Sequence, residues 1–144
     1  MSTRDFVTTI KGILAPLAGS SAELPLAEVN AYDKKEGLSL PAVNITVEEP
    51  FTVNREDTAH NERTTIVTVR LLVANIDGET AELARLDVID AILDKLDQQS
   101  TIDTLNGVQD IWEVSEVVRF ESDDSESIMG WEFFITGRNA VEFT

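Results

Sequence analysis

The hydrophobic positions of this chain recur at two different spacings, which predict helices in some segments and strands in others. In residues 4–17 the apolar side chains fall three and four positions apart, so they share one face of a helix that ends near Pro16 and Gly19. A second helix is predicted from Glu79. Its apolar side contains Val88, Ile89, Ile92, Leu93 and Leu96, and its opposite side carries Asp87, Asp90, Asp94 and Asp97. The aspartates indicate a helix that faces solvent on one side.

Strict alternation predicts the strands. Val43, Ile45 and Val47 alternate with polar residues, and residues 64–74 are rich in β-branched side chains. A short strand is expected near residues 27–32, and residues 111–120 and 131–136 are predicted to form a C-terminal hairpin with a polar tip. Residues 54–63 have no apolar pattern and are predicted as a projecting loop, and Asn106-Gly107 as a turn. The order helix, strand, strand, helix, strand, strand predicts one α+β domain over residues 1–144, with two main helices packed on a mixed or antiparallel sheet.

Two of these strands carry apolar side chains on both faces. Ile66 and Leu72 point away from the main apolar face of their strand, and Phe134 does the same in the last strand. A sheet that is apolar on both sides must be covered on both sides, either by the two helices or by another subunit. We favour another subunit, so Ile66, Leu72 and Phe134 are candidate interface residues.

The charge balance narrows the class of protein. The chain has 27 acidic and 11 basic side chains, a net charge of -16, and 42% hydrophobic residues, enough to form a core. So acidic a chain is poorly suited to gripping nucleic acid, which requires clustered Lys and Arg. The absence of cysteine excludes disulfides, thiolate metal sites and thiol nucleophiles. No apolar run is long enough for a bilayer, and the N-terminus lacks a signal-peptide pattern, so we expect a soluble, unexported protein without a membrane partner.

No residue pattern in the chain is typical of catalysis. His60 is the only histidine and lies in the predicted polar loop, with no nucleophile-elbow pattern elsewhere. Asp123, Asp124 and Glu126 lack the alternating frame of a calcium loop, and no glycine-rich phosphate loop occurs. We therefore expect no enzymatic activity, no metal and no cofactor. The aspartates of the second helix serve either solubility or a negative field around the molecule.

The order of elements carries a resemblance to a known family. The segments LPAVNITV (40–47), TTIVTVRLLV (64–73) and ETAELARLDVIDAIL (79–93), with the first helix and the closing hairpin, resemble the tail terminator (tail-completion) proteins of long-tailed bacteriophages. The likeness spans nearly the whole chain and rests on fold and size, because that family has no invariant binding signature.

The resemblance implies a structural virion protein in the tail or neck, assembled in the host cytoplasm. Its subunits would form a hexameric ring on the head-proximal end of the tail tube, stop tube polymerisation, and join the tail to the head connector or stopper protein. Its partners would be further copies of itself, the tail tube protein and the connector or stopper. Double-stranded DNA would pass through the channel without specific binding.

An acidic bore fits that role because it repels phosphate. Glu56, Asp57, Glu113 and Glu132 are candidate channel-facing acids. Three alternatives remain open. Another neck or tail component, such as a stopper or tube subunit, would share these features. An acidic inhibitor or immunity-type protein that binds a basic partner predicts a one-to-one complex and no ring. A metal-dependent hydrolase predicts stabilisation by the metal.

Overall fold

The computed structural model describes residues 3–21, 23–47, 52–55, 60–108, 111–121 and 127–142. Within these residues the helices are α1 (Thr3–Leu14), the 3-10 turn η1 (Ala15–Leu17), α2 (Glu79–Asp97) and α3 (Gln99–Val108). The strands are β1 (Glu28–Asn30), β2 (Ala42–Val47), β3 (Thr52–Arg55), β4 (His60–Ala74), β5 (Ile111–Glu121) and β6 (Ile128–Glu142). The α+β fold predicted from the sequence is confirmed.

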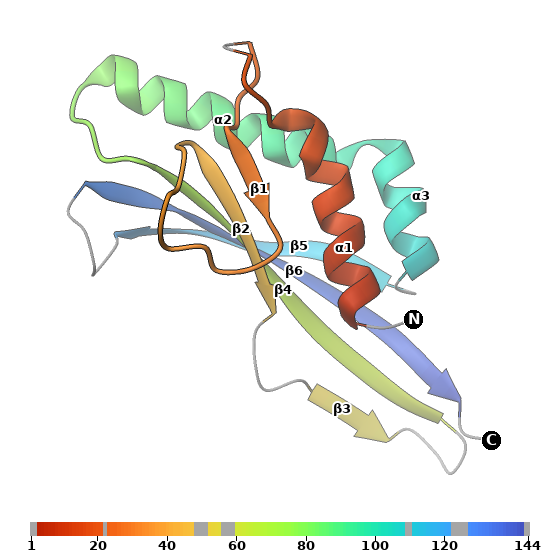
Figure 1. Cartoon of the computed structure of the whole chain (residues 1–144). Coiled ribbons are helices and arrows are strands. Elements are labelled where there is room, and N and C mark those ends of the chain that lie inside the picture. The colour runs from red at the N-terminus through yellow and green to blue at the C-terminus, as the bar shows by residue number, and fades with distance from the viewer. Residues whose placement is uncertain are drawn as a thin grey trace.

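One mixed sheet contains all six described strands, in the order β1-β2-β4-β6-β5. β1 runs parallel to β2, and the other neighbours are antiparallel. The central pair, β4 and β6, is aligned from His60 opposite Glu142 to Ala74 opposite Ile128. β3 pairs with the first residues of β4, past the end of β2. The two long strands therefore extend well beyond the helices (Figure 1).

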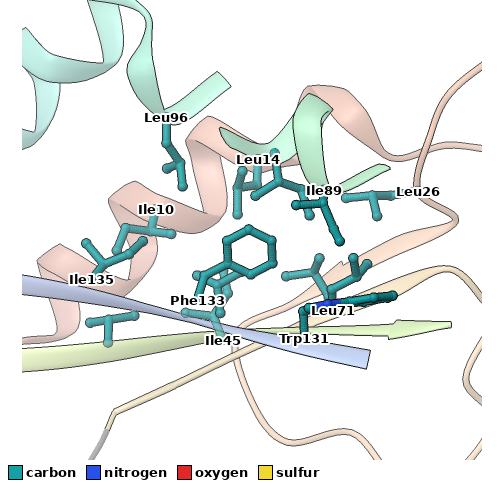
Figure 2. Close-up of a cluster of buried hydrophobic side chains, with 14 of the residues drawn as sticks. Ile10, Leu14, Leu26, Ile45, Leu71, Ile89, Leu96, Trp131, Phe133 and Ile135 are labelled. Carbon is teal, nitrogen blue, oxygen red and sulfur yellow. The ribbon is translucent and has the colours of Figure 1, made fainter. Parts of the chain in front are cut away.

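All three α-helices lie on the same side of the sheet (Figure 1). Alternate residues of β4 and β6 point toward them and are buried with the apolar faces of the helices in a single cluster (Figure 2). The cluster includes Phe6, Ile10 and Leu14 of α1, Ile89, Ile92 and Leu96 of α2, Leu105 of α3, and Val67, Val69, Leu71, Trp131, Phe133 and Ile135 of the sheet. Each large side chain buried here contributes about 1.5–3 kcal/mol of transfer free energy. The other side of the sheet has no helix among the described residues.

Three predictions from the sequence are wrong. Residues 54–63 are not one loop, because 52–55 pair with 61–64 and residues from His60 onward also pair with β6. These strands are defined by backbone pairing, and the sequence of 54–63 has no apolar alternation that would predict them. Residues 56–59 lie outside the described residues. The helix α3 was not predicted, and Asn106-Gly107 belongs to its end instead of a turn. The last strand is also much longer than residues 131–136.

Candidate functional site

The side of the sheet without helices is here called the helix-free face. On β4 it carries the residues that alternate with the core, and the β4–β6 register places Glu132, Phe134, Thr136 and Arg138 on the same side. The β5–β6 register adds Glu113, Glu116, Val118 and Phe120. This surface therefore combines aromatic, aliphatic and charged side chains from three adjacent strands.

The three residues predicted at a subunit interface all lie on the helix-free face. Ile66 and Phe134 are half-buried, and Leu72 is only 6% exposed because neighbouring groups of the same chain already cover it. Val118, 40% exposed, was not predicted but lies on this face too. The accessible apolar side chains of this face therefore include Ile66, Val118, Phe120 and Phe134.

Arg70 lies in the middle of this face and contacts Glu132 and Phe120. The Nε atom of Arg70 lies 3.7 Å from Oε1 of Glu132, and its guanidinium carbon lies 4.3 Å from the centroid of the Phe120 ring. The Phe120 ring, on β5, can reach Arg70, on β4, because Gly130 of the intervening strand β6 has no side chain. A Cβ at Gly130 would lie 2.9 Å from Cε1 of Phe120. A guanidinium over an aromatic face is attracted by the ring quadrupole. The cluster thus holds a positive charge beside an aromatic ring on this face.

A hollow of about 360 Å³ opens beside this cluster. Its lining comes from three strands and the segment after β1, and consists of Asp33, Thr46, Thr68, Arg70, Glu132 and Phe134. The hollow is open to solvent and has both a phenyl wall and polar groups. An open hollow with an aromatic wall and polar groups can receive a side chain of another molecule.

A polar network limits the helix-free face at its β1 edge. The fully buried Asn44 donates a hydrogen bond to the carbonyl oxygen of Lys34 (2.9 Å) and accepts one from the amide of Asn30 (3.1 Å). Asn30 also donates to Glu28, and Nζ of Lys34 lies 2.9 Å from that carboxylate. These bonds fix the segment after β1 across the end of β2, so this part of the face is already covered.

This network predicts acid sensitivity. The hydrogen bond from Asn30, with the Lys34 ammonium, holds the pKa of Glu28 below its usual value. A carboxyl whose pKa is lower in the folded state stabilises the fold above its unfolded pKa, and that stability is lost as the pH falls through the folded pKa. We expect the free energy of unfolding, measured with urea, to fall between neutral pH and about pH 3, and Glu28→Gln to flatten this fall. Glu36→Gln, at an exposed position of the same segment, is the matched control; an equal flattening there would contradict the assignment.

A second ionic cluster ties α2 to the edge strand β5. The buried Arg85 donates to the carbonyl oxygen of Ile76 (2.8 Å) and to Glu82, and this contact lowers the pKa of Glu82. Glu82 also lies 3.9 Å from Arg119, whose guanidinium sits 5.7 Å from the centroid of Trp131. Arg85 was missed in the sequence because it occupies an apolar-side position of α2. Its hydrogen bonds to Ile76 and Glu82 join α2 to the segment that precedes it.

The candidate channel acids have different surroundings. Glu113 is exposed on β5 and lies on the helix-free face, as does Glu132, whose charge is partly neutralised by Arg70. Glu56 and Asp57 lie outside the described residues. His60 is the first residue of β4 instead of part of a loop. The structure therefore brings Glu113 and Glu132 to one surface.

The described residues show neither a cluster of metal ligands nor a membrane-spanning helix. Among the described residues, no group of three or more His, Cys, Asp or Glu side chains is placed to hold a metal ion. No helix in the described part of the chain is both long and apolar enough to cross a membrane. Neither a scan against models of protein families nor a search of curated proteins finds a match to this chain.

Proposed function

We propose that this chain is a structural virion subunit of the tail terminator type, which forms a ring on the head-proximal end of a phage tail tube. The observation that carries the proposal is the helix-free face, where Ile66, Phe134 and Val118 remain accessible beside an open hollow. A half-apolar sheet face on a small domain favours contact with another protein surface. The ring would stop tube polymerisation and present a surface to the head connector or stopper protein.

A ring requires two different patches on each subunit, since a head-to-tail contact repeats around the axis. The helix-free face supplies one of them. Glu132, paired with Arg70 in the middle of this face, is assigned to the subunit contact. Glu113, exposed on the edge strand β5, stays a candidate for the channel wall. The net charge of -16 on each copy supports a bore that repels DNA phosphate and lets DNA slide.

Electron microscopy of the purified protein, alone and mixed with tail tubes, tests this function. We expect rings that cap one end of the tubes and prevent further growth. Phe134→Asp should remove the rings without unfolding the domain, because it places a charge in the centre of the contact. Asn106→Asp adds the same charge at an exposed position of α3 and should leave the rings intact.

Salt gives a second measurement in the same experiment. Copies that each carry a net charge of -16 repel one another, and this repulsion is screened over about 10 Å at 0.1 M salt. We therefore expect the ring population, measured by mass photometry, to rise with ionic strength. Assembly that weakens steadily with salt would instead indicate that ion pairs between copies outweigh this repulsion.

The same images separate the alternatives. A tube subunit would polymerise into long tubes, and a stopper would bind the connector without capping tail tubes. An acidic inhibitor is favoured by the exposed aspartates of α2, Asp87, Asp90, Asp94 and Asp97. It would stay monomeric, leave tail tubes uncapped, and bind a basic protein one to one. That outcome would exclude the ring.

A further inference from the structure

The outward side of α2 carries two leucines that the core does not use. Leu83 is 54% and Leu86 44% exposed, although leucines at these positions gain nothing from facing water. They share one helix face with Asp87 and Asp90, because the four positions follow the spacing i, i+3, i+4, i+7. Within the described residues, no ion pair joins either aspartate to a cation. This stripe, Leu83, Leu86, Asp87 and Asp90, is here called the α2 ridge.

The helix-free face offers the complementary features. Ile66 and Phe134 provide apolar contact area beside the hollow of about 360 Å³. Arg138 is exposed on the same face and has no acidic partner among the described residues. Arg70 adds a second positive charge, only loosely paired with Glu132 at 3.7 Å. The exposed leucines of the ridge would thus meet a hollow, an aromatic ring and two arginines, on a face that also carries Glu113, Glu116 and Glu132.

We infer that the α2 ridge of one copy docks on the helix-free face of the next copy, and this inference rests on the proposed ring. The ridge and the face lie on opposite sides of the sheet, so the contact uses two different patches of each subunit, as a ring demands (Figure 1). Leu83 and Leu86 pack against Phe134 and Ile66. Asp87 and Asp90 face Arg138, which gives a new ion pair beside the apolar contact.

Charge disfavours a two-fold contact between two ridges. Two ridges packed together would place Asp87 and Asp90 against the same aspartates of the other copy, whereas two helix-free faces would bring together Glu113, Glu116 and Glu132 of both copies beside Arg70 and Arg138. Like charges juxtaposed in an interface cost several kcal/mol. The ridge-to-face arrangement avoids the contact between aspartates and places each ridge near Arg138, which is exposed and has no acidic partner among the described residues.

Single cysteines can test the pairing, because the natural chain has none. Leu86→Cys places one thiol on the ridge, and Thr136→Cys places another on the helix-free face beside Phe134 and Arg138. The two variants are purified separately, mixed under ring-forming conditions and oxidised. We expect cross-links between the two variants to exceed cross-links within either variant by about 10-fold or more. Asn106→Cys, exposed on α3, replaces Leu86→Cys in the control mixture and should not cross-link to Thr136→Cys.

A charge exchange provides a second readout. Asp90→Arg and Arg138→Asp should each weaken self-association by about 10-fold, the equivalent of about 1.4 kcal/mol, and the double variant should recover most of it. Asp103→Arg on α3 changes the net charge equally and controls for weaker overall repulsion. Circular dichroism verifies that each variant is folded.

The outcomes separate this inference from the proposed function. Rings that cap tail tubes but show no preferred ridge-to-face cross-link, and no recovery in the double variant, would overturn the pairing and leave the ring in place. Cross-links within one variant would assign a two-fold contact and overturn it as well. A strict monomer, alone and with tail tubes, would overturn both.

Discussion

Replacing Gly130 by alanine is expected to destabilise the fold by about 3 kcal/mol or more, which corresponds to a fall of roughly 10 °C in the melting temperature. Gly130 lies in β6, between β4 and β5. A Cβ atom there would lie 1.8 Å from the carbonyl oxygen of Leu71 and 2.9 Å from Cε1 of Phe120. The phenyl ring can turn, but the carbonyl belongs to the strand beside it. The β4–β6 pairing must therefore open locally to admit one methyl group.

Gly12→Ala is the matched control for this substitution. It makes the same chemical change in α1, where an added Cβ meets nothing within 4 Å. Alanine should stabilise that helix by about 0.5–1 kcal/mol, because glycine loses more backbone freedom on folding. The two variants should thus shift urea and thermal unfolding in opposite directions. A Gly130→Ala protein as stable as the natural one would show that the close approach of the two strands is not required.

How far the sequence predicts the fold depends on whether an element buries a periodic face. α2 was predicted from its first residue because Ile89, Ile92 and Leu96 repeat at helical spacing and face the core. α3 buries only Thr101 and Leu105 over its ten residues, too few for a visible period. The start of β4 is held by backbone pairing with β3 and β6, which leaves no trace in the spacing of apolar residues.

The helix-free face was predictable only in part. Ile66, Leu72 and Phe134 were placed on it correctly because β4 and β6 keep a regular alternation of side chains. β5 does not: its register shifts between Val114 and Glu116, so Trp112 and Val114 face the helices while Val118 and Phe120 face the opposite side. The contact of Phe120 with Arg70 depends on that bulge and on the glycine between them. Neither can be read from one strand alone.

The outward side of α2 was also predicted only in part. Leu83 and Leu86 were not singled out from the sequence, although they share a helix face with Asp87 and Asp90, which was assigned to solvent. α2 packs on the sheet through Arg85 and Ile89, and both leucines are exposed.

The adjacent Phe133 and Phe134 should respond in opposite ways to truncation. Phe133→Ala is expected to cost about 3–5 kcal/mol of stability, since this ring is fully buried among Ile10, Leu14 and Ile89 between the helices and the sheet (Figure 2). Phe134→Ala, on the helix-free face, removes a half-buried ring and should cost clearly less, because little of a cavity is left in the core.

In assembly, we expect Phe134→Ala to have the larger effect of the two variants. Phe134→Ala should remain a folded monomer with a reduced tendency to form rings, whereas Phe133→Ala should assemble normally at low temperature, as long as the domain stays folded. Urea unfolding gives the first comparison, and mass photometry at a fixed salt concentration gives the second. Phe133 and Phe134 are neighbours in β6, so their side chains point to opposite faces of the sheet. This alternation alone would explain why one side chain matters for stability and the other for assembly. If Phe134→Ala lowered stability as much as Phe133→Ala and left assembly unchanged, the helix-free face would be part of the fold, and the subunit contact would have to lie elsewhere.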